Sequence, residues 1–226
     1  MSIKRVFFLF PLLLSGLLCT SCFQLIEEVS VKQDGSGTAV LTANLSQSKS
    51  KLAAVMLLDS VNGYPVPSKA DIRRELEQLV GELQQTDGIS NVTYTLDFNT
   101  FIASISWSFA RVEDLNTITD RVFEKMKVTT ANHASYAYLP ATKTFSRTYV
   151  YEPTAKKEFD KLKAADQAVF ENAIYTSIYR FDIPVVSNSN PIAKVSASKK
   201  AVMLQSPLMD LINGRKNLSN RIKLAN

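Results

Sequence analysis

Cysteine is nearly absent from this chain of 226 residues, and its two cysteines, Cys19 and Cys22, both lie near the N-terminus. No cysteine follows residue 22, which excludes disulfides, a thiol nucleophile and a cysteine-based metal site from the rest of the chain. His133 is the only histidine, so a zinc site built on two histidines is excluded as well. We interpret this lone histidine, in the segment Asn-His-Ala-Ser, as a surface residue.

The sequence motifs of common enzyme classes are also missing. There is no phosphate-binding glycine loop, no nucleophile elbow and no EF-hand loop. Most acidic residues adjoin Lys or Arg on predicted helices, which indicates solvated surfaces, and Asp97 and Asp182 would matter only if the fold buried them together. The basic residues are not interleaved with aromatic ones, so we expect no nucleic-acid partner. The sequence predicts a protein that is not an enzyme and holds no cofactor or metal.

One apolar run, residues 6–18, is present, but it contains Pro11 and falls short of the roughly 20 residues that a membrane-spanning helix needs. Lys4 and Arg5 precede this run, and the small residues Thr20 and Ser21 follow it. A charged start, a short apolar core and a small-residue exit are typical of a secretory signal peptide. A retained membrane helix is the less favoured interpretation.

The exit from this run, Leu18-Cys19-Thr20-Ser21-Cys22, resembles the bacterial lipobox, although Cys19 stands where leucine is commonest. The resemblance implies that residues 1–21 are cleaved off and that Cys22 becomes the mature N-terminus. Cys22 would then carry a diacylglycerol thioether and an N-linked acyl chain such as palmitate. These lipids would anchor the protein almost permanently to the membrane, its expected partner. Secretion without a lipid, after cleavage behind Ser21, is the alternative, but a free N-terminal thiol is unusual in an oxidising compartment.

Phe23 and Gln24 follow Cys22 where an aspartate would signal retention. By resemblance to lipoprotein sorting signals, this implies a place in the bacterial cell envelope, on the periplasmic side, at the outer membrane of a cell that has one.

Residues 22–226 are expected to form a single soluble α+β domain, because β-hairpins alternate with helices and no long linker divides them. The order is ββα, ββα, ββα and then a β-rich end, with a further helix before the second hairpin. We therefore expect a mostly antiparallel sheet built from ββα units, with helices on one face. Strands are predicted at 25–33, 38–46, 92–99, 101–109, 136–139, 144–151, 173–183, 193–197, 201–205 and 218–224, and helices at 51–58, 68–87, around 115–126 and at 153–171.

Two patterns inside this plan have a direct structural meaning. Asp34-Gly35-Ser36-Gly37 predicts a hairpin turn, and a calcium-binding turn is disfavoured because no acids follow it. Apolar and Ser residues alternate along 101–109, which predicts a sheet with one core face and one polar face.

The aromatic residues of the strands line either an apolar cavity or, as the more ordinary interpretation, a packed core. These residues are Phe98, Trp107, Phe109, Tyr149, Tyr175 and Phe181.

Residues 29–38, so close behind Cys22, resemble the opening hairpin of a group of bacterial lipoproteins of unknown function, and the segments Phe181-Asp182-Ile183-Pro184 and Ser198-Lys199-Lys200 resemble their C-terminal region. The sequence is also similar to the mycobacterial LppM-like lipoproteins, whose soluble domain is implicated in binding lipid. The resemblance brings no catalytic residue. The first expectation is thus a non-enzymatic lipoprotein that binds another envelope protein or takes part in assembly, and the alternative is a carrier or binder of lipid or another apolar ligand.

Overall fold

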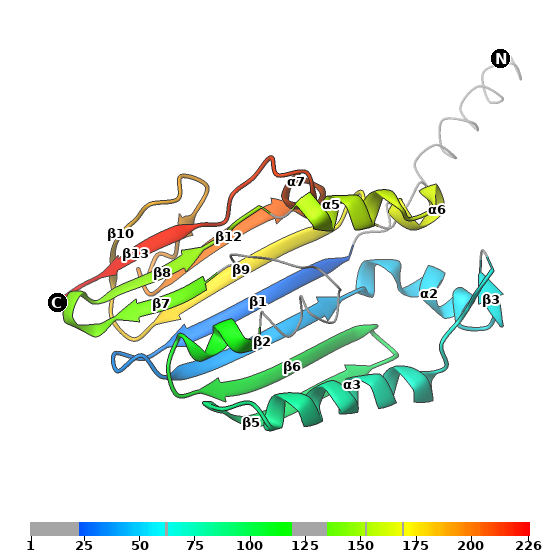
Figure 1. The fold of residues 1–226 in the computed structure, drawn as a ribbon, viewed down its shortest axis with the longest axis horizontal. Helices are drawn as coiled ribbons and strands as arrows, with labels where there is room; N and C mark the ends of the chain where they lie inside the picture. Colours follow the sequence, from blue (N-terminus) through cyan, green and yellow to red (C-terminus); the bar gives the residue numbers. More distant parts are fainter. Residues whose placement is uncertain (1–22, 62, 119–134, 152, 169) are drawn as a thin grey trace, which may run out of the picture.

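The computed structural model describes residues 23–61, 63–118, 135–151, 153–168 and 170–226 (Figure 1). Cys19, Cys22 and His133 lie outside these residues, as does most of the helix predicted around 115–126, of which 114–118 are described and helical. Within the described part of the chain, no helix has the length and apolar character needed to cross a membrane.

The larger of the two main sheets has seven strands in the order β11-β12-β9-β1-β2-β6-β5. Neighbouring strands are antiparallel except β1 (Gln24–Val31) and β9 (Ile174–Phe181), which pair in parallel, with Val29 opposite Tyr179. The remaining strands are β2 (Gly37–Asn44), β5 (Ile89–Asp97), β6 (Ile102–Phe109), β11 (Lys194–Val195) and β12 (Ala201–Pro207).

The predicted Asp34–Gly37 hairpin joins β1 to β2. Asp34 Oδ1 accepts hydrogen bonds from the Ser36 amide at 3.0 Å and the Ser36 hydroxyl at 2.7 Å, while Gly35 takes a φ of 86° that favours glycine. Gly37 is required for a different reason, since a Cβ there would lie 1.9 Å from the carbonyl oxygen of Ser30. The Asp34 carboxylate thus stabilises the turn.

The predicted division of the sheet into a core face and a polar face is confirmed. Val29, Ala39 and Trp107 lie side by side on the core face and are buried. On the opposite face, hydroxyl pairs link neighbouring strands, with Thr42 bonded to Ser104 and Thr93 bonded to Ser106, each at 2.8 Å.

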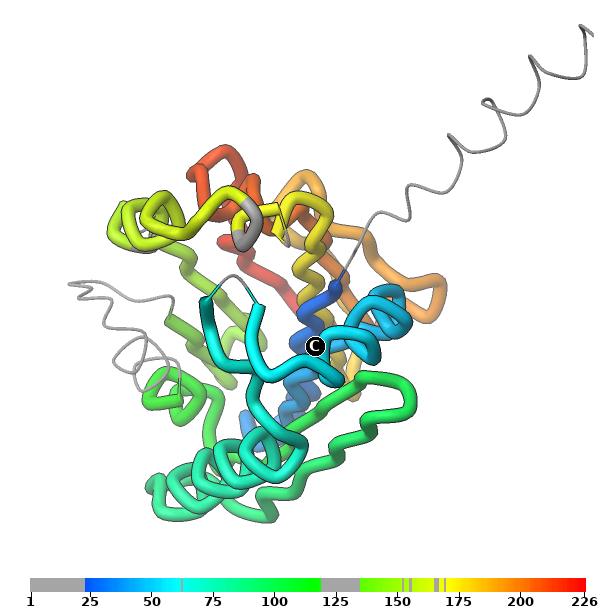
Figure 2. The backbone as a smooth tube through the Cα atoms, turned by 90° about the vertical axis from the view of Figure 1, so that its right-hand side faces the viewer, coloured from blue at the N-terminus to red at the C-terminus, as the bar shows by residue number. Residues whose placement is uncertain are grey.

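A second, four-stranded sheet covers part of the core face, in the order β10-β13-β8-β7. Its strands are β7 (Ser135–Leu139), β8 (Thr144–Thr148), β10 (Val185–Asn188) and β13 (Asn220–Leu224). Figure 2, which looks along the strands, shows the two sheets as separate layers. Phe145 of β8 is fully buried between them, with its ring 4.9 Å from that of Tyr179 and 5.6 Å from that of Phe181.

The longest described helix, α3 (Lys69–Gln84), packs on β5 beside the second sheet. Ser68, with Asp71 three residues later, predicts a capping box at its start. In the structure the Ser68 hydroxyl accepts from the Asp71 amide and the Asp71 carboxylate accepts from the Ser68 amide, each at 3.1 Å. Leu76, Leu79, Val80 and Leu83 face the core, as their spacing predicts. The fold is therefore the mixed α+β, mostly antiparallel structure that the sequence predicts.

Several shorter elements differ from the prediction. The helix expected at 153–171 is two helices, α5 (Pro153–Asp160) and α6 (Ala164–Gln167). The helix expected at 51–58 begins with a 3₁₀ turn, Ser46–Ser48, and continues as α2 (Lys49–Val55). Segments outside the predicted strands and helices contain β3 (Ser60–Val61), β4 (Tyr64–Pro65) and β10, and α7 (Leu208–Ile212) follows β12. These elements are too short to show a hydrophobic period of their own.

Candidate functional site

Two places in the molecule gather side chains of functional interest: a polar cluster between the sheets and an apolar groove beneath α2. Asp97 and Asp182, the two strand carboxylates noted in the sequence, are exposed and are not buried together. Among the described residues, no group of three or more His, Cys, Asp or Glu side chains could hold a metal ion.

The polar cluster centres on Arg147, whose side chain is 8% exposed. Its Nη1 donates to the Tyr179 hydroxyl at 3.0 Å, and its Nη2 donates to the Tyr175 hydroxyl at 3.1 Å. Nη1 also lies 3.5 Å from Oε2 of Glu27. Glu27 in turn accepts hydrogen bonds from the hydroxyls of Tyr136, at 2.5 Å, and Tyr175. We call these five residues the Arg147 cluster.

Burial and charge hold the three tyrosines and the arginine of the Arg147 cluster in one protonation state each. Burial raises the pKa of Tyr136, Tyr175 and Tyr179, and this effect outweighs the opposing attraction of the Arg147 charge. Burial alone would lower the pKa of Arg147, but the three tyrosines and Glu27 raise it well above its ordinary value. The tyrosines are neutral and the guanidinium is charged at any physiological pH.

This arrangement is better suited to joining the sheets than to catalysis. Glu27 and the tyrosines at 175 and 179 belong to the larger sheet, whereas Tyr136 and Arg147 belong to the smaller one. Perturbed pKa values often mark active sites, but structural ion-pair networks produce them too. Here the carboxylate already accepts two hydroxyls and faces the guanidinium, so no group in the cluster is poised as a nucleophile or base.

The second place, which we call the α2 groove, has a volume of about 260 Å³ and lies between α2, the start of α3 and the turn that joins β5 to β6. Of the thirteen described residues that line it, twelve are apolar: Leu45, Leu52, Val55, Met56, Val66, Pro67, Ile72, Leu96, Phe98, Phe101, Ile102 and Ala103. The thirteenth, Asp97, directs its carboxylate to the Asn99 amide and the Thr100 hydroxyl, both at 2.7 Å. These bonds lower the pKa of Asp97, whose carboxylate therefore caps the turn.

A second hollow of about 310 Å³ adjoins the α2 groove, and Met56, Phe98 and Phe101 line both spaces. Lys49 and Lys69 line this second hollow, and Lys69 Nζ lies 5.4 Å from the centre of the Phe98 ring. The groove is therefore apolar, and the hollow beside it is positively charged. Each has a volume near the lower end of the range for pockets that hold small organic ligands.

The local sequence explains why this groove is open. Leu52, Val55 and Met56 lie three and four positions apart, so they share the side of α2 that faces the groove. None of the residues of α2 is fully buried, because the helix covers the groove without filling it.

Most of the aromatic residues named from the sequence form a packed core, the more ordinary of the two interpretations. Of the six, only Phe98 lines the α2 groove. Trp107, Phe109 and Phe181 are buried in the core, while Tyr149 and Tyr175 pack against it, as in the more ordinary interpretation. Sequence reasoning also missed the Arg147 cluster. Its signal was a charged residue on an apolar strand face: Glu27 precedes Val29 and Val31 at alternate positions, and Arg147 follows Phe145.

Comparison with known proteins gives one distant likeness. No protein-family model and no curated protein sequence matches the chain. Among solved structures, the folded domain of the LppM protein of Mycobacterium tuberculosis, determined by NMR, is similar over 90% of this chain and 91% of that chain, with 10% sequence identity and a TM-score of 0.43. A likeness of this degree does not indicate what the present chain binds.

Proposed function

We propose that this protein is a non-enzymatic lipoprotein of the bacterial envelope, lipid-modified at Cys22, whose domain binds the acyl chain of an amphiphilic lipid. The observation that supports this function is the α2 groove, an open apolar space that adjoins a second hollow lined by Lys49 and Lys69. Water in such a groove makes few hydrogen bonds, so its replacement by an acyl chain is favourable. The lysines would face an anionic or strongly polar headgroup.

The position of the α2 groove also favours a lipid. Gln24, the first residue of β1, pairs with Asn44, and the next residue, Leu45, lines the groove. The Leu45 amide donates to the carbonyl of Phe101, another lining residue, at 2.9 Å. Cys22 is only two residues before Gln24, and an extended residue spans about 3.5 Å. A lipid anchor on Cys22 would therefore hold the groove close to the membrane that supplies its ligand.

A photoreactive lipid tests the binding site directly. A diazirine-bearing fatty acid, added to the purified full-length protein and irradiated, is expected to label peptides that carry Leu52, Met56 or Phe101. Ala103→Phe, which fills the groove from β6, should reduce this labelling at least about tenfold, because a filled pocket no longer accepts the chain. The matched control is Ala137→Phe on β7, a half-exposed strand alanine outside the groove. Labelling elsewhere, or labelling that survives Ala103→Phe, would refute the groove as the site.

The lipid anchor is tested separately. Mass spectrometry of the mature N-terminus should find Cys22 as the first residue, carrying a diacylglyceryl thioether. Cys22→Ser should release the protein from the membrane fraction, while Cys19→Ser should leave both the lipid and the location unchanged. An unmodified Cys22 in the mature protein would exclude the anchor whatever the groove binds.

A role in binding another envelope protein, the first expectation from the sequence, is the second candidate. Val186 of the edge strand β10 is 67% exposed and Leu139 at the end of β7 is 59% exposed. Single exposed apolar residues are normal on monomers, so these two support the role less strongly than the α2 groove supports lipid binding.

A further inference from the structure

The end of the molecule around α2 carries exposed apolar side chains on an ordered backbone. Leu57 is 86% exposed and Leu58 is 52% exposed, although their amides donate to the carbonyls of Ala54 and Val55 at 3.2 and 2.9 Å. Tyr64 of β4 is 53% exposed. Two consecutive exposed leucines with an exposed tyrosine nearby in the sequence differ from the scattered apolar residues of an ordinary surface.

Positive charge accompanies these residues. Lys49 and Lys51 belong to α2, and Lys69 begins α3. Lys163, beyond α5, places its Nζ 4.6 Å from the centre of the Tyr64 ring. The acids in this part of the chain are Asp59 and Asp71, and Asp71 is paired with Arg74 at 2.6 Å. Exposed leucines beside lysines, with a tyrosine that has one polar end, are the composition that binds at the surface of an anionic bilayer.

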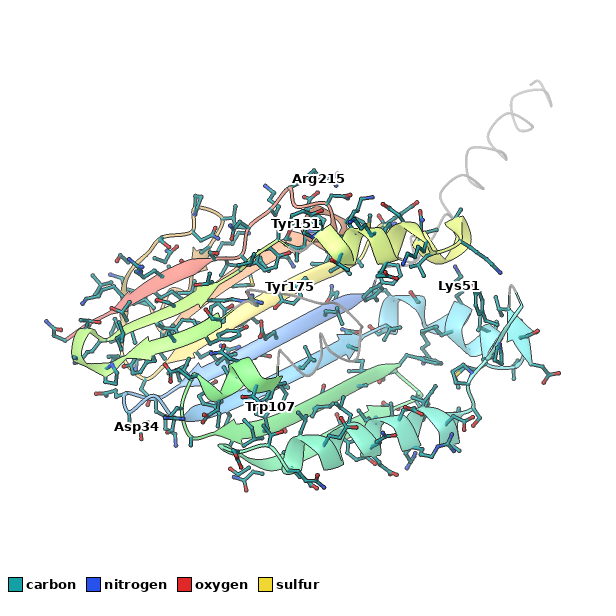
Figure 3. All side chains as sticks on the ribbon, viewed as in Figure 1. Asp34, Lys51, Trp107, Tyr151, Tyr175 and Arg215 are labelled. Atoms are coloured by element: carbon teal, nitrogen blue, oxygen red, sulfur yellow. The ribbon has the colours of Figure 1, made fainter. Side chains whose placement is uncertain are left out.

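The end of the molecule at which β1 begins indicates which partner this surface faces. Figure 1 shows β1 beginning at the α2 end, with the C-terminus at the opposite end. Figure 3 places Lys51 at the α2 end and Asp34, in the β1–β2 turn, at the other. Gln24, with which β1 begins and which is two residues after Cys22, therefore lies at the end of the molecule where Leu57, Leu58 and Tyr64 are exposed.

We propose that Lys49, Lys51, Leu57, Leu58 and Tyr64, which we call the α2 tip, rest on the surface of an anionic lipid bilayer. The leucines enter the headgroup region, the lysines face lipid phosphates, and the Tyr64 hydroxyl stays at the interface. The hollow beside the α2 groove, which Leu57 lines, then faces the membrane surface. This inference rests on the proposed anchor at Cys22 for the orientation of the domain, and it holds whether or not the groove binds lipid.

A fluorescent probe at the α2 tip tests this contact in the full-length lipoprotein, reconstituted in phosphatidylglycerol vesicles that contain lipids brominated along the acyl chain. Leu57→Cys carries an environment-sensitive fluorophore, and the matched control is Leu139→Cys, an exposed leucine of β7 far from the α2 end. Bromine should quench the probe at 57 and leave the probe at 139 bright. Quenching should weaken about fivefold for each of Lys49→Glu and Lys51→Glu, and also in high salt.

Three results would overturn the proposal. One is equal quenching at positions 57 and 139, and another is the absence of quenching at 57. The third is probe self-quenching at 57 that grows with the surface density of the protein, which would indicate a second copy of the chain in place of the bilayer. Mass spectrometry of the same sample reports the lipid on Cys22, so failure of the anchor is distinguished from failure of the α2 tip.

Discussion

The space between the two sheets and the end of the molecule at α2 are both rich in apolar side chains, but these side chains are buried in the first region and partly exposed in the second. Between the sheets, Phe145, Tyr179 and Leu204 are completely buried. At the α2 end, Leu52 and Val55 are half-exposed and line a groove, while Leu57 is almost free of contacts. The first region is filled by its own side chains, and the second leaves room for something else.

The ion pairs of β1 also differ between the inner and the outer face of the larger sheet. Glu27 and Glu28 are neighbours in β1 and point to opposite faces of the sheet, so each meets a different arginine. Glu27 meets the buried Arg147 between the sheets, whereas Glu28 pairs with Arg180 at 2.9 Å on the outer face, where both side chains are at least a third exposed. The comparison indicates that the inter-sheet region is closed by its own side chains and ion pairs, whereas the α2 end keeps an open groove.

The largest expected effect comes from Arg147→Met. Removing the guanidinium leaves the Glu27 carboxylate without its positive partner between the sheets, which should lower the free energy of unfolding by about 3–5 kcal/mol. Arg180→Met, the matched control on the outer face, should cost about 1 kcal/mol or less because water screens the exposed pair. Urea unfolding of both variants measures the difference. Equal losses would show that the inter-sheet region has no special role.

Truncation of one leucine in each region sharpens the comparison. Leu204 of β12 is fully buried, so Leu204→Ala should lower the free energy of unfolding by about 2–5 kcal/mol through the cavity it leaves. Leu52→Ala in α2 should cost less than about 1 kcal/mol, since that side chain already borders an open groove. Fatty-acid labelling should show the reverse. It should fall for Leu52→Ala, whereas the molecules of Leu204→Ala that remain folded should still be labelled. A large stability loss for Leu52→Ala would contradict an open α2 end.

Much of the architecture was predictable because it rests on local chemistry. The Asp34–Gly37 turn, the Ser68 cap and the alternation of β6 each depend on a few neighbouring residues, and all three are confirmed. The pairing of β1 with β9 was not predictable in the same way. Its partners are far apart in the sequence, and nothing in either strand alone specifies which strand it will join.

The candidate site was predicted less well, for a related reason. Leu96, Phe98 and Ile72 lie on β5, the following turn and α3, and they form a groove only because the ends of these elements meet. Trp107 and Phe109 have the same alternation as the groove residue Ala103, yet the second sheet and α3 leave no space beside them. Periodicity identifies the face on which a residue lies, but it does not show whether that face is filled.

Alkaline pH should weaken the inter-sheet region before it affects the α2 groove. Unfolded tyrosine ionises near pH 10, and the folded state raises the pKa of Tyr136, Tyr175 and Tyr179 above this value. The unfolded state therefore loses protons first, so stability is unchanged below about pH 10 and falls above it, by up to about 1.4 kcal/mol per pH unit for each of the three tyrosines. Unfolding curves and tyrosinate absorbance, measured together, should show these tyrosines ionising only as the protein unfolds. Stability that stays flat through about pH 11 would contradict the raised pKa values.

The smallest effect is expected from Ser68→Ala at the start of α3. The substitution removes the hydroxyl that accepts the Asp71 amide and should cost about 1 kcal/mol. Because α3 begins beside the groove residues Pro67 and Ile72, the loss should loosen the α2 end alone. Amide hydrogen exchange should then speed up in the first turn of α3 and remain slow in β1 and β9. Faster exchange in all three elements would mean that the two regions open together, and the contrast between a closed core and an open end would then describe packing only, without a difference in stability.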